Sequence, residues 1–89
     1  MQTIVINVTG KVQGVFFRQS TKERALALGI TGTVRNLAGG NVQIMATGTK
    51  EQLDTLVAWC RQGPSRATVT GVEWRKETLT EFDEFTIVR

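Results

Sequence analysis

The sequence predicts an α+β fold in which two helices pack on one face of a mainly antiparallel sheet. Several segments alternate apolar and polar residues, as expected of strands that are buried on one face. Two segments between these strands instead have residues suited to one buried face at helical spacing. With 89 residues, 40% hydrophobic and 21% charged, the chain has the size and composition of one globular domain spanning residues 1–89.

The first strand and the first helix are predicted at residues 3–9 and 18–28. Apolar side chains occupy every second position of the first segment. The second segment is rich in strong helix formers, and Gly29 is expected to end it. The buried face of this helix is expected to comprise Phe17, Thr21, Ala25 and Leu28.

A β-hairpin is predicted next, with strands at residues 31–35 and 41–47. The intervening loop, residues 36–40, contains the two adjacent glycines that a tight hairpin connection favours.

The second helix begins after Thr49, whose spacing to Gln52 predicts a capping box. Gly63 and Pro64 follow in the order that ends a helix. Its buried stripe is expected to comprise Leu53, Leu56, Val57 and Cys60.

Two further strands are predicted at residues 67–76 and 82–88. The alternation in the first of them changes phase at Gly71, which indicates a β-bulge. The order of elements is therefore β-α-β-β-α-β with an added C-terminal strand, the ferredoxin-like α/β sandwich. This fold hosts enzymes, RNA-binding modules and small-molecule sensors, so it does not define the function.

The cysteine and histidine content limits the kinds of site that the chain can form. The chain has one cysteine and no histidine, so it lacks an internal disulfide, a cysteine-based zinc site and the commonest general base. Cys60 continues an apolar stripe and is expected in the core. We therefore expect no metal and no cofactor.

We also expect a cytoplasmic monomer that contacts neither membrane nor nucleic acid. No segment is long and apolar enough to span a bilayer, and no secretory signal follows Met1. The net charge of +3 comes from basic residues scattered along the sequence, which favours a solvated surface with a smaller role in steering anions.

The segment most informative about function is Gly10-Lys11-Val12-Gln13-Gly14-Val15-Phe16-Phe17-Arg18. It joins a strand to a helix, so its backbone N–H groups and the positive end of the helix dipole would form a cradle for a phosphate. Arg18 is a cation at that positive end, which is unfavourable unless an anion lies nearby. The segment from Gly10 to Arg18 is not a nucleotide-binding P-loop, because it does not end in Gly-Lys-Ser/Thr.

Asn36 is the second candidate. It ends a strand that the fold places at the same rim as the cradle, so its side-chain amide is expected to face Arg18. Of the two adjacent phenylalanines, one is expected in the core and the other at the wall of the pocket.

Three segments resemble the acylphosphatase family. The segment from Gly10 to Arg18 is similar to its signature, and weaker similarity occurs in Gly32-Thr33-Val34-Arg35-Asn36 and in Gly63-Pro64-Ser65-Arg66-Ala67-Thr68-Val69. Many members have tryptophan where this chain has Thr33, a position that belongs to the predicted strand and not to the two catalytic residues.

The resemblance implies hydrolysis of acyl phosphates to a carboxylate and phosphate without a metal. The family's catalytic residues correspond to Arg18 and Asn36. Its phosphate-binding loop corresponds, through backbone N–H groups, to Gln13, Gly14, Val15, Phe16 and Phe17.

Two other interpretations stay open from sequence. A nucleic-acid-binding module would use the positive charge, although the first and third predicted strands contain no aromatic residue to stack on bases. A catalytically silent anion sensor, or a domain of a larger maturation protein, would retain the cradle without turnover.

Overall fold

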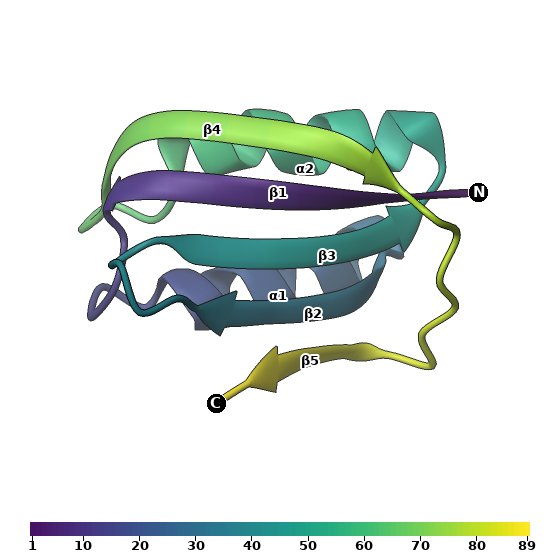
Figure 1. Cartoon of the computed structure of the whole chain (residues 1–89), viewed down its shortest axis with the longest axis horizontal. Coiled ribbons are helices and arrows are strands. Elements are labelled where there is room, and N and C mark those ends of the chain that lie inside the picture. Colours follow the sequence, from purple (N-terminus) through teal and green to yellow (C-terminus); the bar gives the residue numbers. More distant parts are fainter.

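The structure, a computed structural model, describes residues 1–89 and has two layers: one sheet and two helices that both lie on one of its faces (Figure 1). The elements are β1 (Gln2–Lys11), α1 (Phe17–Leu28), β2 (Thr31–Asn36), β3 (Val42–Gly48), α2 (Lys50–Gln62), β4 (Thr68–Glu77) and β5 (Phe85–Val88). Each predicted helix and strand is present. The predicted ferredoxin-like fold is confirmed.

The sheet has five strands in the order β4-β1-β3-β2-β5. The pairs of β1 with β3, β1 with β4 and β2 with β3 are antiparallel, whereas β5 runs parallel to β2. Because β5 adds to the outer side of β2, the strand that ends at Asn36 is paired along both of its edges.

The core lies between the sheet and the two helices. Phe17 is only 1% exposed and contacts Trp59 of α2 with their ring centroids 5.5 Å apart, so it joins the two helices. The predicted α2 stripe is buried as expected, and so are three of the four residues predicted for α1; Leu28 is partly buried.

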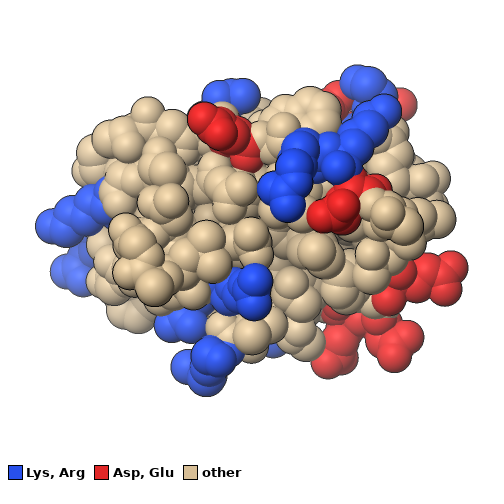
Figure 2. Space-filling model, viewed as in Figure 1, with Lys and Arg blue, Asp and Glu red and all other residues tan.

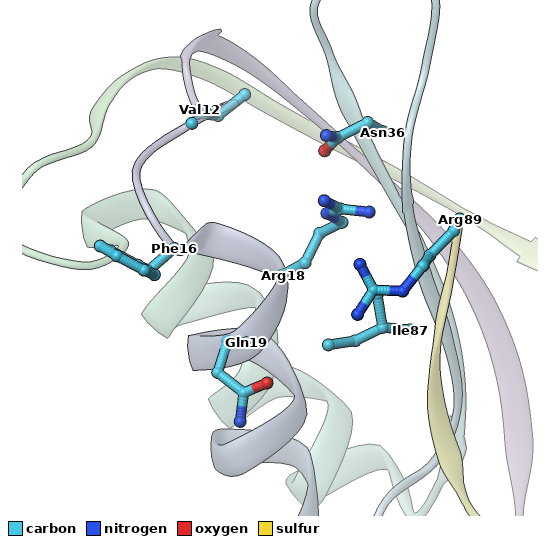
Figure 3. A pocket seen from close by; sticks show the side chains of 8 residues that line it. Val12, Phe16, Arg18, Gln19, Asn36, Ile87 and Arg89 are labelled. Carbon is cyan, nitrogen blue, oxygen red and sulfur yellow. The ribbon is translucent and has the colours of Figure 1, made fainter.

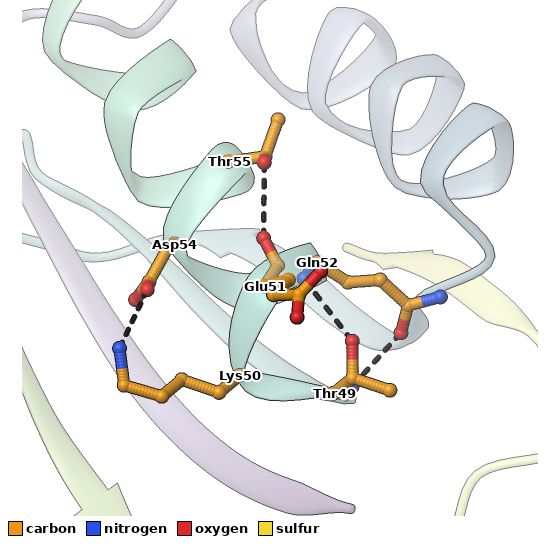
Figure 4. Close-up of polar contacts among 6 residues, drawn as sticks. All are labelled: Thr49, Lys50, Glu51, Gln52, Asp54 and Thr55. Carbon is orange, nitrogen blue, oxygen red and sulfur yellow. Dashed lines mark hydrogen bonds and ion pairs between the residues drawn. The ribbon is translucent and has the colours of Figure 1, made fainter.

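The predicted capping box at the start of α2 is also present (Figure 4). The Gln52 backbone N–H donates to the Thr49 hydroxyl at 3.2 Å, and the Thr49 backbone N–H donates to the Gln52 side chain at 2.8 Å. Lys50 and Asp54, one turn apart at the start of α2, form an exposed ion pair at 2.8 Å, which contributes little to stability.

The predicted bulge lies one residue from the expected position. Thr9 pairs with Gly71 and Gly10 pairs with Val69, so Thr70 is the extra residue. Gly10 has a φ of 125°, and a Cβ there would collide with the Thr68 carbonyl oxygen. The close approach of β1 and β4 at this point thus requires glycine, immediately before the chain enters the candidate phosphate cradle.

The last strand is shorter than predicted, since it begins at Phe85 and not at residue 82. The preceding segment, residues 78–84, crosses the end of the sheet, where the Thr80 carbonyl accepts hydrogen bonds from the hydroxyls of Thr3 (3.3 Å) and Thr47 (2.7 Å). These bonds direct the chain away from β4, so the apolar pattern at residue 82 does not continue into a ladder.

Trp74 lies on the edge strand β4 and is 48% exposed. Neither helix is long and apolar enough to cross a membrane. The cellular compartment stays a prediction.

Candidate functional site

A pocket of about 490 Å³ opens at the end of the sheet where the loop after β1 meets the ends of β2 and β5 (Figure 3). This volume is in the range of small-molecule sites. The pocket is lined by Val12, Gly14, Phe16, Arg18, Gln19, Asn36, Ile87 and Arg89. It contains both residues predicted to be catalytic and no acidic residue.

The loop that forms one side of the pocket has an unusual backbone. Gly14 and Phe16 have φ angles of 75° and 63°, and Phe16 is the only residue other than glycine with a positive φ. A bulky residue in this region is strained by roughly 1–3 kcal/mol, and such strain tends to occur at functional sites. Phe16 is 70% exposed at the pocket, whereas Phe17 is in the core, so the predicted division between the two rings is confirmed.

The backbone N–H groups of residues 13–19 have no acceptor within the protein. The next backbone N–H group along the chain, that of Ser20, donates to the Phe16 carbonyl oxygen at 3.0 Å. Helix α1 has no side-chain cap and no acidic residue in its first turn. The loop and helix start therefore present free donors and a positive dipole end, which suits an anion.

Arg18 lies in the first turn of α1 and is half-buried. Its guanidinium points across the pocket toward Asn36 (Figure 3). It forms no ion pair and no side-chain hydrogen bond within the protein. A cation held at the positive end of a helix without a counter-ion is electrostatically unfavourable, and an anion in the pocket removes that cost.

Asn36 faces Arg18 from the opposite side, at the last residue of β2. Its Oδ1 atom is buried and has no hydrogen-bond partner, the one side-chain atom of the protein in that state. An unpaired buried acceptor costs about 1–3 kcal/mol, and such a group in a native protein often marks a functional site. The structure thus brings the two predicted residues together.

The five residues predicted for the cradle contribute in different ways. Gly14 and Phe16 line the pocket, whereas the side chains of Val15 and Phe17 are buried in the core and leave only their backbone toward the loop. Gln13 uses its side chain as well: Nε2 donates to the carbonyl oxygens of Leu37 at 2.8 Å and Asn41 at 2.9 Å. This amide holds the loop against the hairpin that begins after Asn36.

We expect Gln13→Glu to lower the free energy of unfolding by about 1–3 kcal/mol, because it removes two donated hydrogen bonds and places a carboxylate against two carbonyl oxygens. Urea unfolding measures this. Gln43→Glu is the matched control, because the Gln43 side chain accepts bonds from Arg35 and a carboxylate still accepts them. Equal losses in the two variants would contradict a specific role of the Gln13 amide.

Sequence analysis missed four residues that line the pocket: Val12, Gln19, Ile87 and Arg89. Ile87 lies in β5 and Arg89 directly follows it, and nothing in the sequence indicated that this strand pairs with β2. Arg89 is the most consequential of them, because it brings a second guanidinium to the pocket near Arg18 (Figure 3).

Cys60 lies in the core, where burial raises the pKa of its thiol to about 12. Its place in the core agrees with the sequence analysis, and the thiol is protonated at neutral pH and unsuited to act as a nucleophile. No three side chains of the types that commonly bind metals cluster together.

The surface charge is uneven although the basic residues are scattered in the sequence. In the view of Figure 2, basic side chains predominate at the left end, where the loop after β1 and the β2–β3 hairpin lie. Acidic side chains gather at the lower right, toward the connection between β4 and β5. This separation favours the approach of anions at the pocket end of the molecule.

Fold and pocket together define a ferredoxin-like α/β sandwich with an anion-binding pocket between its first helix and the end of β2. Residues 4–87 match the family model described as Acylphosphatase. The chain belongs to the acylphosphatase family, and by this membership it is an acylphosphatase-type hydrolase.

Relatives and solved structures agree with this assignment. The chain is 47% identical to an acylphosphatase of Methylococcus capsulatus over 90 residues, covering 100% of this chain and 98% of the relative. It superposes on the acylphosphatase from Coxiella burnetii with a TM-score of 0.95 at 37% identity, covering 98% and 92% of the two chains. For the Bacillus subtilis acylphosphatase the TM-score is 0.96 at 31% identity, with both chains fully covered.

Proposed function

We propose that the pocket hydrolyses the carboxyl–phosphate bond of acyl phosphates, with Arg18 and the loop binding the phosphate and Asn36 orienting the attacking water. The observation that supports this most directly is the pairing of unsatisfied groups across one pocket. Free N–H donors and an unpaired guanidinium lie on one side, and the buried, unpaired Asn36 Oδ1 lies on the other.

The phosphate would bind at the start of α1. Backbone N–H groups of Gln13 to Phe17 donate to its non-bridging oxygens, and the planar fork of Arg18 donates to two of them. These groups stand ready before substrate arrives, so they stabilise the charge of the transition state without rearrangement. In phosphoryl transfer, positioning and charge stabilisation account for most of the catalysis.

The water would be held by the Asn36 side chain, whose Oδ1 accepts one of its hydrogens. The water oxygen forms a new bond to phosphorus while the bond from phosphorus to the carboxyl oxygen breaks, and its electron pair leaves with the carboxylate. Asparagine does not act as a base at neutral pH, so the water's proton passes to the phosphate or to solvent. The products are a carboxylate and inorganic phosphate.

The chemistry of the leaving group explains why so few catalytic residues suffice for hydrolysis of an acyl phosphate. A carboxylate is weakly basic and departs without a general acid, whereas the alkoxide of a phosphate monoester needs protonation. The pocket offers no acidic side chain or imidazole to supply that proton. We therefore propose a preference for acyl phosphates over alkyl phosphates and an activity that needs no metal.

The test measures acetyl phosphate depletion by the full chain with EDTA present, with β-glycerol phosphate as the alkyl phosphate. We expect turnover of the former in EDTA and a rate near the uncatalysed one for the latter. Phosphate binding without turnover would identify a silent anion sensor and overturn the proposal. Activity that is lost in EDTA and restored by a divalent ion would overturn metal independence.

A further inference from the structure

We propose that Arg89 forms a second anion subsite, which binds a carboxylate carried by the acyl part of the substrate. The inference rests on the proposed function of Arg18 and Asn36 and specifies which acyl phosphates suit the pocket. The favoured substrates are the monophosphates of short dicarboxylic acids.

Arg89 is an exposed cation that shares its pocket with Arg18. It lines the same pocket as Arg18, its guanidinium points toward that pocket in Figure 3, and it forms no ion pair. No acidic side chain lines the pocket to separate the two charges. Two like charges that line one open pocket repel each other although solvent screens them in part, and a ligand with two negative groups offsets that repulsion.

The groups around the two arginines differ. Arg18 lies beside the free N–H groups of the loop and opposite Asn36, which together offer a phosphate and a water all the partners they need. Arg89 approaches from β5 on another side of the pocket and has no such cluster of donors around it. A single guanidinium fork matches one carboxylate with two parallel hydrogen bonds.

An apolar side chain connects the two subsites. Ile87, in β5, precedes Arg89 by two residues, and both line the same pocket. In Figure 3 it lies beside the guanidinium of Arg89 on the side of α1. The methylene groups of a short acyl chain would pack on Ile87, with the phosphate at Arg18 and the terminal carboxylate at Arg89.

The experiment compares succinyl phosphate with butyryl phosphate, which have the same number of carbons and differ in the terminal carboxylate. We expect Arg89→Gln to lower kcat/KM for succinyl phosphate by about threefold to tenfold more than for butyryl phosphate, the range for a partly exposed pair with a charged hydrogen bond. The additional loss should appear in KM, because the carboxylate is bound equally in the ground and transition states. It should shrink as salt is raised.

Arg24→Gln is the matched control, because it removes the same charge from an exposed position of α1 outside the pocket. It should leave the ratio of the two substrates unchanged, and Arg89→Lys should retain part of the preference. Equal losses for both substrates in Arg89→Gln would overturn the subsite, and so would no loss for either. Failure of the wild-type chain to hydrolyse both substrates would overturn the proposed function itself, and the inference with it.

Discussion

Replacing Arg18 by lysine is expected to lower kcat/KM for acetyl phosphate by about 10³–10⁵-fold, the range for arginines that stabilise phosphoryl transfer. This equals about 4–7 kcal/mol of lost transition-state stabilisation. Lysine keeps the charge but not the planar fork, so it contacts one phosphate oxygen where Arg18 would contact two. Steady-state kinetics with acetyl phosphate measures the loss.

The control for this prediction is Arg24→Lys, the same substitution on the exposed part of the same helix. It should keep full activity, and both variants should have the same thermal midpoint as the wild type. Acetyl phosphate hydrolysis that is unchanged in Arg18→Ala would contradict the proposed role of Arg18 altogether.

Asn36→Ala is expected to lower kcat for acetyl phosphate by about 10²-fold or more while inorganic phosphate still binds with nearly its original affinity. The substitution removes the acceptor that would position the water but leaves Arg18 and the loop N–H groups in place, and misplacing a reactant costs about this much. Initial rates give kcat, and competitive inhibition by inorganic phosphate gives the affinity.

A second substitution at this position separates orientation from charge. Asn36→Asp keeps an oxygen at the same place but brings a negative charge opposite Arg18, so phosphate should bind more weakly than it does to Asn36→Ala. Asn41→Ala, across the hairpin loop from Asn36 and outside the pocket, should leave kcat unchanged. A kcat for Asn36→Ala within twofold of the wild type would remove Asn36 from the mechanism.

The features predicted from sequence are those that depend on local patterns. The α2 stripe and its capping box lie within a few residues of one another, so periodicity and spacing are sufficient to predict them. The meeting of Arg18 and Asn36 was also predictable, because the topology places the loop after β1 and the end of β2 at the same edge of the sheet. The roles of these two residues stay predictions that the kinetics must test.

The features that sequence did not predict depend on long-range contacts. Arg89 reaches the pocket only because β5 pairs in parallel with β2, and a short apolar strand carries no signal of its partner. The Gln13 side chain bonds to backbone atoms 24 and 28 residues away, which no spacing rule indicates. The separation of charge on the surface likewise depends on how distant segments come together.

Because β2 is paired with a strand on each side, amide protons on the Asn36 side of the pocket should exchange with solvent more slowly than those on the loop side. Amide protons of β2 are hydrogen-bonded to neighbouring strands, so their exchange with solvent waits for the sheet to come apart. Those of residues 13–19 have no such protection and open independently of it. The protein thus holds its candidate water-binding residue at the end of a strand that is paired along both edges, and its phosphate loop in a segment whose free N–H groups a bound anion can order.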